Sequence, residues 1–131
     1  MAEIQLGRMQ LRMMQVIWKA GRCTAREITA AMNAEEPTAH STVQTLLRTL
    51  EDKGAVAHEV EGRTFIFYPL VREDQVRQDA TADLVERVFG GSAGSLVSYL
   101  LKSGKVSRKE LDEIRRLIDA ERKKRSERRQ R

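Results

Sequence analysis

The sequence predicts a mainly α protein with a small β-hairpin, arranged as one folded N-terminal domain followed by a smaller helical domain. Apolar residues recur at helical spacing in six segments, whereas residues 56–68 hold two short runs rich in β-branched and aromatic residues. The chain has 131 residues, 40% of them hydrophobic. That is enough for one main core and an appendage that a partner completes.

The first two helical segments have recognisable start and stop signals. Residues 6–20 place apolar side chains on one stripe and end at Gly21. Thr24 and Glu27 have the spacing of a capping box, in which the hydroxyl accepts from a first-turn N–H and the glutamate reaches back. They open a short second helix, and the polar, proline-containing residues 33–37 follow as a turn.

A third helix and a hairpin complete the N-terminal domain. The helix spans about residues 38–53 and ends at Gly54, an expected left-handed cap. Residues 56–60 and 64–68 predict two strands, which must pack against the helices because a lone hairpin is marginal in water. This order of elements predicts a winged helix-turn-helix domain, with the hairpin as the wing.

The C-terminal part predicts three more helices with exposed aliphatic stripes. Residues 73–89 form an amphipathic helix that Gly90 breaks, residues 96–101 form a short apolar helix, and Ser107 caps a last helix. These helices cannot bury their aliphatic residues alone, so a symmetric second copy is the simplest cover. The predicted dimer interface contains Leu84, Val88, Leu96, Val97, Leu100, Leu111, Ile114, Leu117 and Ile118.

The third helix has two contrasting faces. Its apolar side is formed by Val43, Leu46, Leu47 and Leu50, and its polar side by Ser41, Gln44, Thr45 and Arg48, with Thr42 on the flank. Glutamine pairs with adenine, arginine with guanine, and threonine offers a hydroxyl or a methyl group. Such a face is also expected on any amphipathic helix whose polar side is exposed to water and binds no partner. Its position as the third helix of the domain favours contact with DNA bases.

Arg63 lies at the predicted tip of the hairpin. There it is placed for a phosphate or for the minor groove, although an isolated hairpin arginine is simply exposed about as often. We therefore include Arg63 with Ser41, Thr42, Gln44, Thr45 and Arg48 as the predicted DNA-binding residues.

Four stretches, in order along the chain, give it a specific likeness. The stretches are Met14-Gln15-Val16-Ile17-Trp18, Ser41-Thr42-Val43-Gln44-Thr45-Leu46-Leu47-Arg48, Arg63-Thr64-Phe65-Ile66-Phe67-Tyr68-Pro69, and Phe89-Gly90-Gly91 with Ser95-Leu96-Val97. Through them the sequence resembles the penicillinase-repressor family (BlaI/MecI type) over nearly its whole length.

The resemblance implies a homodimeric repressor that binds palindromic operator DNA and occludes promoters. In the best-known members a membrane sensor protease signals β-lactam exposure, an antibiotic-resistance response, and the repressor is then cleaved in its C-terminal domain. The corresponding region here is Tyr99-Leu100, which differs from the Asn-Phe bond of the staphylococcal members. Copper-responsive relatives add a cysteine-rich C-terminus, which this chain lacks.

Charge is unevenly distributed along the chain. The net charge is +5, but residues 122–131 alone contribute +6, so residues 1–121 sum to −1. A tail of this kind is more often a solvated end than a specific DNA arm. No run of roughly 18 apolar residues and no leader pattern is present, which predicts a cytoplasmic protein without membrane insertion.

We therefore predict a winged helix-turn-helix domain over residues 1–71, a helical dimerisation domain over residues 72–122 and a disordered basic tail over residues 123–131. No enzyme, cofactor or metal site is expected, because His40, His58 and the single cysteine, Cys23, lack partners at catalytic or ligand spacing. The main alternative is a winged-helix module for protein–protein assembly. A surface of that kind should show large apolar anchors on the third helix, which this one lacks.

Overall fold

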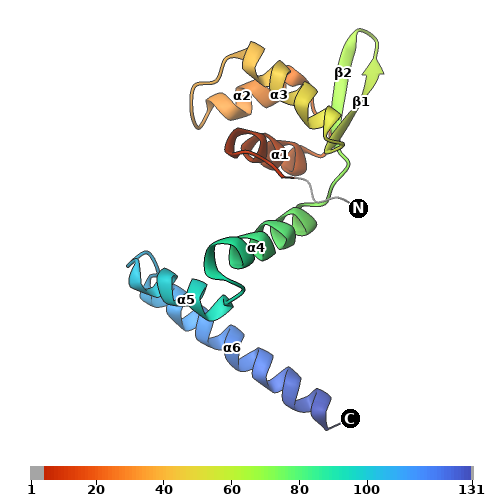
Figure 1. Cartoon of the computed structure of the whole chain (residues 1–131). Helices are drawn as coiled ribbons and strands as arrows, with labels where there is room; N and C mark the ends of the chain where they lie inside the picture. Colours follow the sequence, from red (N-terminus) through yellow and green to blue (C-terminus); the bar gives the residue numbers. More distant parts are fainter. Residues whose placement is uncertain (1–4, 131) are drawn as a thin grey trace. The chain divides into compact units, whose positions relative to one another are not determined.

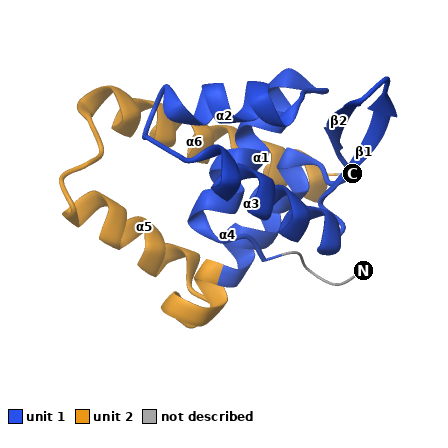
Figure 2. Ribbon diagram, turned by 90° about the horizontal axis from the view of Figure 1, so that it is seen from above, with its two compact units in different colours: residues 1–83 blue, residues 84–131 orange. Residues whose placement is uncertain are grey.

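The computed structural model describes residues 5–130 and contains six helices and one two-stranded antiparallel sheet (Figure 1). In chain order the elements are α1 (Arg8–Ala20), α2 (Ala25–Asn33), α3 (His40–Asp52), β1 (Val56–Glu61), β2 (Thr64–Pro69), α4 (Glu73–Phe89), α5 (Ala93–Lys102) and α6 (Arg108–Arg129). The predicted fold class is confirmed. The chain divides into two compact units, which meet within α4, after Asp83 (Figure 2).

The first unit holds the hydrophobic core, built by α1, α2, α3 and the hairpin. Twelve buried side chains form it: Met13, Met14, Ile17, Cys23, Ile28, Met32, Val43, Leu47, Leu50, Ala55, Val56 and Phe67. The core residues from the helices all belong to the predicted apolar stripes. A few other stripe residues, such as Met9, Val16 and Leu46, are only partly buried and pack against this core. Gly21 and Gly54 both have a φ of +79°, a conformation that suits glycine where the chain leaves a helix.

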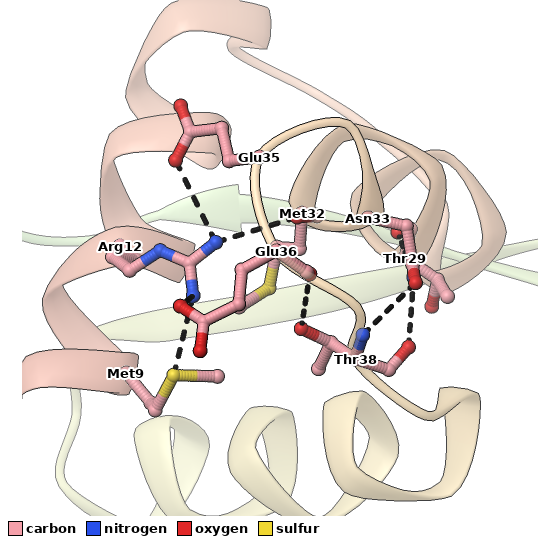
Figure 3. Close-up of polar contacts among 8 residues, drawn as sticks. All are labelled: Met9, Arg12, Thr29, Met32, Asn33, Glu35, Glu36 and Thr38. Carbon is pink, nitrogen blue, oxygen red and sulfur yellow. Dashed lines mark hydrogen bonds and ion pairs between the residues drawn. The ribbon is translucent and has the colours of Figure 1, made fainter.

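The turn between α2 and α3 is fixed by side chains from three segments (Figure 3). The Asn33 amide donates to the backbone oxygens of Thr29 and Thr38, at 2.7 Å each, and accepts from the Thr38 N–H at 2.9 Å. From α1, the Arg12 guanidinium donates to the Met32 carbonyl at 3.3 Å. It also contacts the carboxylates of Glu35 and Glu36 at 3.5 and 3.3 Å. These bonds fix the direction in which α3 leaves the turn.

The base of the hairpin is hydrogen-bonded to the loop between α1 and α2. Cys23, in the loop before α2, exchanges two backbone hydrogen bonds with Phe67 of β2, at 3.0 and 2.7 Å. At the other end, Glu61 pairs with Thr64, so the turn consists of Gly62 and Arg63. Gly62 has a φ of +63°, as the first central residue of a tight hairpin turn requires. Arg63 therefore lies at the wing tip, as predicted.

The second unit, which begins at Leu84, lacks a core of its own. No side chain from residue 84 to residue 130 is buried. Nine of the twelve exposed large hydrophobic residues belong to this unit: Leu84, Val88, Val97, Tyr99, Leu100, Leu101, Leu111, Leu117 and Ile118. Within it, the Phe89 and Tyr99 rings contact each other at 5.6 Å between centroids.

The C-terminal tail differs from its prediction. Residues 123–129, expected to be disordered, continue α6 as a regular helix to Arg129. Arginine, lysine and glutamate are good helix formers, and Glu121 pairs with Arg125 one turn later at 3.1 Å. Arg128 and Arg129 in the last turn also complement the negative end of the helix dipole. A high net charge was therefore a poor guide to local disorder.

None of the helices in the described part of the chain has both the length and the apolar character needed to span a lipid bilayer.

Candidate nucleic-acid interface

The polar face of α3 is exposed along its whole length. Ser41, Thr42, Gln44, Thr45 and Arg48 are all exposed, while the opposite face of the helix is buried in the core. The Thr45 hydroxyl donates to the Ser41 carbonyl at 3.1 Å, so its donor is used within the helix. Its methyl group and its oxygen lone pairs stay available to a partner. The helix is thus anchored on one side and offers hydrogen-bonding side chains on the other.

A groove with a volume of about 820 Å³ lies between this helix and the wing. Arg26 from α2 and Gln44 and Arg48 from α3 line one part of it, and Arg63 and Phe65 from the hairpin line another. Among residues 5–130, no hydrogen bond or ion pair engages the guanidinium of Arg26, Arg48 or Arg63. Three elements, α2, α3 and the hairpin, therefore each place an unpaired arginine in the same groove.

The groove also contains one carboxylate, that of Glu51 near the end of α3. It accepts a hydrogen bond from Nδ1 of His58 in β1, and the two side chains are 30% and 29% exposed. The His58 ring is stacked on Phe65, with 4.2 Å between centroids and 13° between planes. The pair links α3 to the wing, and it engages the one acidic side chain among the described residues that line the groove.

The two faces of the hairpin differ in chemistry because side chains alternate along a strand. His58, Phe65 and Phe67 belong to the groove lining, whereas Glu59 and Glu61 alternate with His58 along β1. Arg22 pairs with these two glutamates at 2.9 and 3.3 Å.

The surroundings of Arg22 complete the base of the wing. Its guanidinium lies 5.8 Å from the centre of the Tyr68 ring. The hydrogen bond to Glu59 is the main cause that raises the pKa of Arg22. Arg22 thereby pairs with both acidic side chains of the wing and offsets part of their charge, and the arginines of the groove remain unpaired.

Comparison with known proteins gives the same family as the four sequence stretches. The family model for the penicillinase repressor matches residues 6–120. The penicillinase repressor of Bacillus licheniformis is 26% identical over 94% of this chain and 96% of its own length. The methicillin resistance regulatory protein MecI of Staphylococcus aureus is 24% identical, over 81% of this chain and 86% of its own.

The chain belongs to the penicillinase-repressor family.

A solved structure supports the fold of the first unit. The DNA binding domain of the repressor BlaI is 32% identical, with a TM-score of 0.51, and the match covers 55% of this chain and 88% of that domain. The predicted family and winged-helix fold are both confirmed, and the family is one of repressors and not of enzymes.

Of the six residues predicted to bind DNA in this family member, Gln44, Arg48 and Arg63 line the groove together. Ser41, Thr42 and Thr45 lie on the exposed face of α3 outside the groove lining. Their roles in binding stay predictions. Arg26 was not predicted as a groove residue, because it lies inside the capping box Thr24–Glu27 and so carried only a helix-start signal. The link between Glu51 and His58 was not predicted either, because neither residue lies in a local pattern that indicates it.

The two remaining candidate residues, His40 and Cys23, and Trp18 pack or form hydrogen bonds within the first unit. Nδ1 of His40 hydrogen-bonds the Thr29 hydroxyl at 2.7 Å. Cys23 is 3% exposed, and burial, with a smaller effect of Glu27, raises the pKa of its thiol to about 11. A thiol with that pKa is protonated and unreactive at neutral pH. Trp18 packs on the core and donates to the Val71 carbonyl at 2.9 Å.

Proposed function

We propose that this protein is a DNA-binding transcriptional repressor that inserts the polar face of α3 into the major groove of an operator and sets the wing tip on the adjacent backbone. The observation behind this proposal is that the polar face of α3 adjoins the arginine-lined groove, since Gln44 and Arg48 belong to both. Side chains suited to base edges lie beside cations suited to phosphates. The domain of BlaI that resembles the first unit is a DNA binding domain.

Gln44 and Arg48 are the proposed specificity residues. Both are exposed, lie one helical turn apart and have side chains that form bidentate hydrogen bonds with adenine and guanine. The α3 face contains no large apolar side chain, so it lacks the buried anchor that a protein–protein assembly surface needs. We therefore favour DNA over the alternative of an assembly module.

We further propose that the repressor acts as a homodimer on palindromic operators, held together by the second unit. Its aliphatic residues are exposed in a single chain: Leu111 is 44%, Ile118 48% and Leu117 69% accessible to solvent. A second copy covers the same stripes by symmetry, whereas an unrelated partner would need a separately matched surface. Two α3 helices then meet two half-sites, which explains why family operators are expected to be palindromic.

Proteolytic inactivation by a sensor protease is a further part of the proposal. Tyr99 and Leu100 lie inside α5 and are 66% and 48% exposed. Cleavage between them would separate α6, with its aliphatic stripe, from α4. Mass spectrometry of the protein from β-lactam-treated cells tests this step. An intact chain in cells that have relieved repression would contradict it.

The base contacts are tested by fluorescence anisotropy with a duplex selected from random DNA by the full-length protein. Gln44→Ala and Arg48→Ala should each weaken binding by about 1–3 kcal/mol, because each removes a bidentate base contact. Gln15→Ala, at an exposed position of α1, is the matched control and should change nothing. Normal affinity and unchanged sequence preference in both α3 variants would refute the proposed function.

A further inference from the structure

We infer that the groove between α2, α3 and the wing binds the phosphodiester backbone, with Arg26 as the phosphate contact from α2 and His58 as the residue that holds Glu51 away from the phosphate. This inference rests on the proposed function and extends it to residues outside the recognition face. It concerns DNA geometry that any sequence presents, so it adds affinity and orientation but no base preference.

Arg26 qualifies by charge, exposure and position. Its side chain is exposed, lines the groove, and has no hydrogen-bond or ion-pair partner among the described residues. Two other exposed arginines of the first unit differ, since Arg22 is engaged by Glu59 and Glu61, and Arg77 pairs with Glu73 at 3.5 Å. Arg8 and Arg72 are also exposed, but neither lines the groove. An arginine left unpaired beside Arg48 and Arg63 fits a ligand that carries repeated negative charge, as a phosphodiester chain does.

The carboxylate of Glu51 would otherwise oppose that ligand. An anion beside a free carboxylate is repelled, and a groove only partly open to water screens this repulsion less than bulk solvent does. The hydrogen bond from His58 fixes the carboxylate against β1, and the ring of His58 is itself held by its stack on Phe65. The pair therefore makes the groove acceptable to phosphate and sets the distance between α3 and the wing.

The first test measures the salt dependence of binding to the selected duplex. Arg26→Gln should weaken binding several-fold and lower the slope of log K against log salt by about one, with sequence discrimination unchanged. Arg8→Gln is the matched control, because Arg8 is an exposed arginine of the same unit that does not line the groove. A slope that stays at the wild-type value in Arg26→Gln overturns the assignment of Arg26.

The second test separates the electrostatic role of His58 from a purely structural one. His58→Phe keeps an aromatic ring for the stack but frees the Glu51 carboxylate, so binding should weaken several-fold. Adding Glu51→Gln removes the freed charge and should restore most of the affinity. If the double variant binds no better than His58→Phe while circular dichroism shows a native fold in both, His58 does not act by holding the Glu51 carboxylate away from the phosphate, and that part of the inference is wrong.

The outcome also distinguishes this inference from the proposed function. Loss of binding in Gln44→Ala and Arg48→Ala together with wild-type behaviour in Arg26→Gln and His58→Phe would leave DNA recognition by α3 intact and refute the groove alone. Wild-type binding by both α3 variants would refute the proposed function itself, whichever way the groove variants behave.

Discussion

Replacing Asn33 tests whether the turn between α2 and α3 sets the position of α3, the proposed recognition helix. Asn33→Ala removes three hydrogen bonds, to the Thr29 carbonyl, the Thr38 carbonyl and the Thr38 N–H. Each contributes about 1 kcal/mol net at most, and the side chain is exposed, so water recovers part of the loss. We expect the free energy of unfolding to fall by about 1–3 kcal/mol.

Asn33→Asp provides an internal scale. A carboxylate still accepts from the Thr38 N–H, but it places an oxygen against the two carbonyls to which the amide donated and adds a negative charge at the C-terminal end of α2. Urea unfolding followed by circular dichroism, at one fixed protein concentration because the proposed dimerisation would shift the midpoint, should rank wild type above Asn33→Ala above Asn33→Asp. Operator affinity should fall in the same order. Equal stability of all three proteins, or lower stability with normal operator affinity, would refute the view that this turn positions α3.

Three further predictions concern other parts of the chain. Deleting residues 122–131 removes a charge of +6 from a segment whose described side chains are all exposed. Non-specific DNA affinity and its salt slope should therefore fall in gel-shift titrations, while operator preference survives. Loss of operator preference in a protein that is still dimeric would contradict this prediction. Leu111→Asp buries a carboxylate in the proposed interface, so sedimentation equilibrium should find monomers and operator affinity should drop by orders of magnitude, whereas a normal dimer would move the interface to the α4 stripe. The pKa of Cys23 is raised to about 11, so its contribution to stability should be fully present below the pKa of the unfolded thiol and be lost as pH rises through 11. Cys23→Ala should abolish that loss in melting experiments at different pH values. Thiol reagents should react with Cys23 at neutral pH only after the protein unfolds.

Local sequence rules predicted the elements because those elements are locally determined. The capping box at Thr24 and the glycines at positions 21 and 54 act within one or two turns of chain, and the structure has them where the rules require. The polar face of α3 was predictable for the same reason, since a period of 3.6 residues alone separates Gln44 and Arg48 from the core.

The links between elements were not predictable in this way. Arg22 meets Glu59 and Glu61 only because the hairpin folds back on the loop before α2, and no local pattern contains that information. The same holds for the place of Arg26 in the groove, which depends on how α2 and the wing are arranged. Net charge was misleading for the tail, where pairing one turn apart supports the helix.

The distribution of buried side chains explains why the two units should respond differently to mutation. Every one of the twelve buried residues lies between Met13 and Phe67, so the winged-helix unit has a core that does not depend on a second copy. The second unit has none, so in the proposed dimer its helices would bury their exposed apolar side chains against the second copy. Weakening that dimer therefore need not unfold the proposed DNA-contacting surface. It would separate two intact α3 helices, each with only the limited affinity of a single half-site. In the proposed scheme, a signal that acts on the second unit can thus release the operator while α3 stays folded.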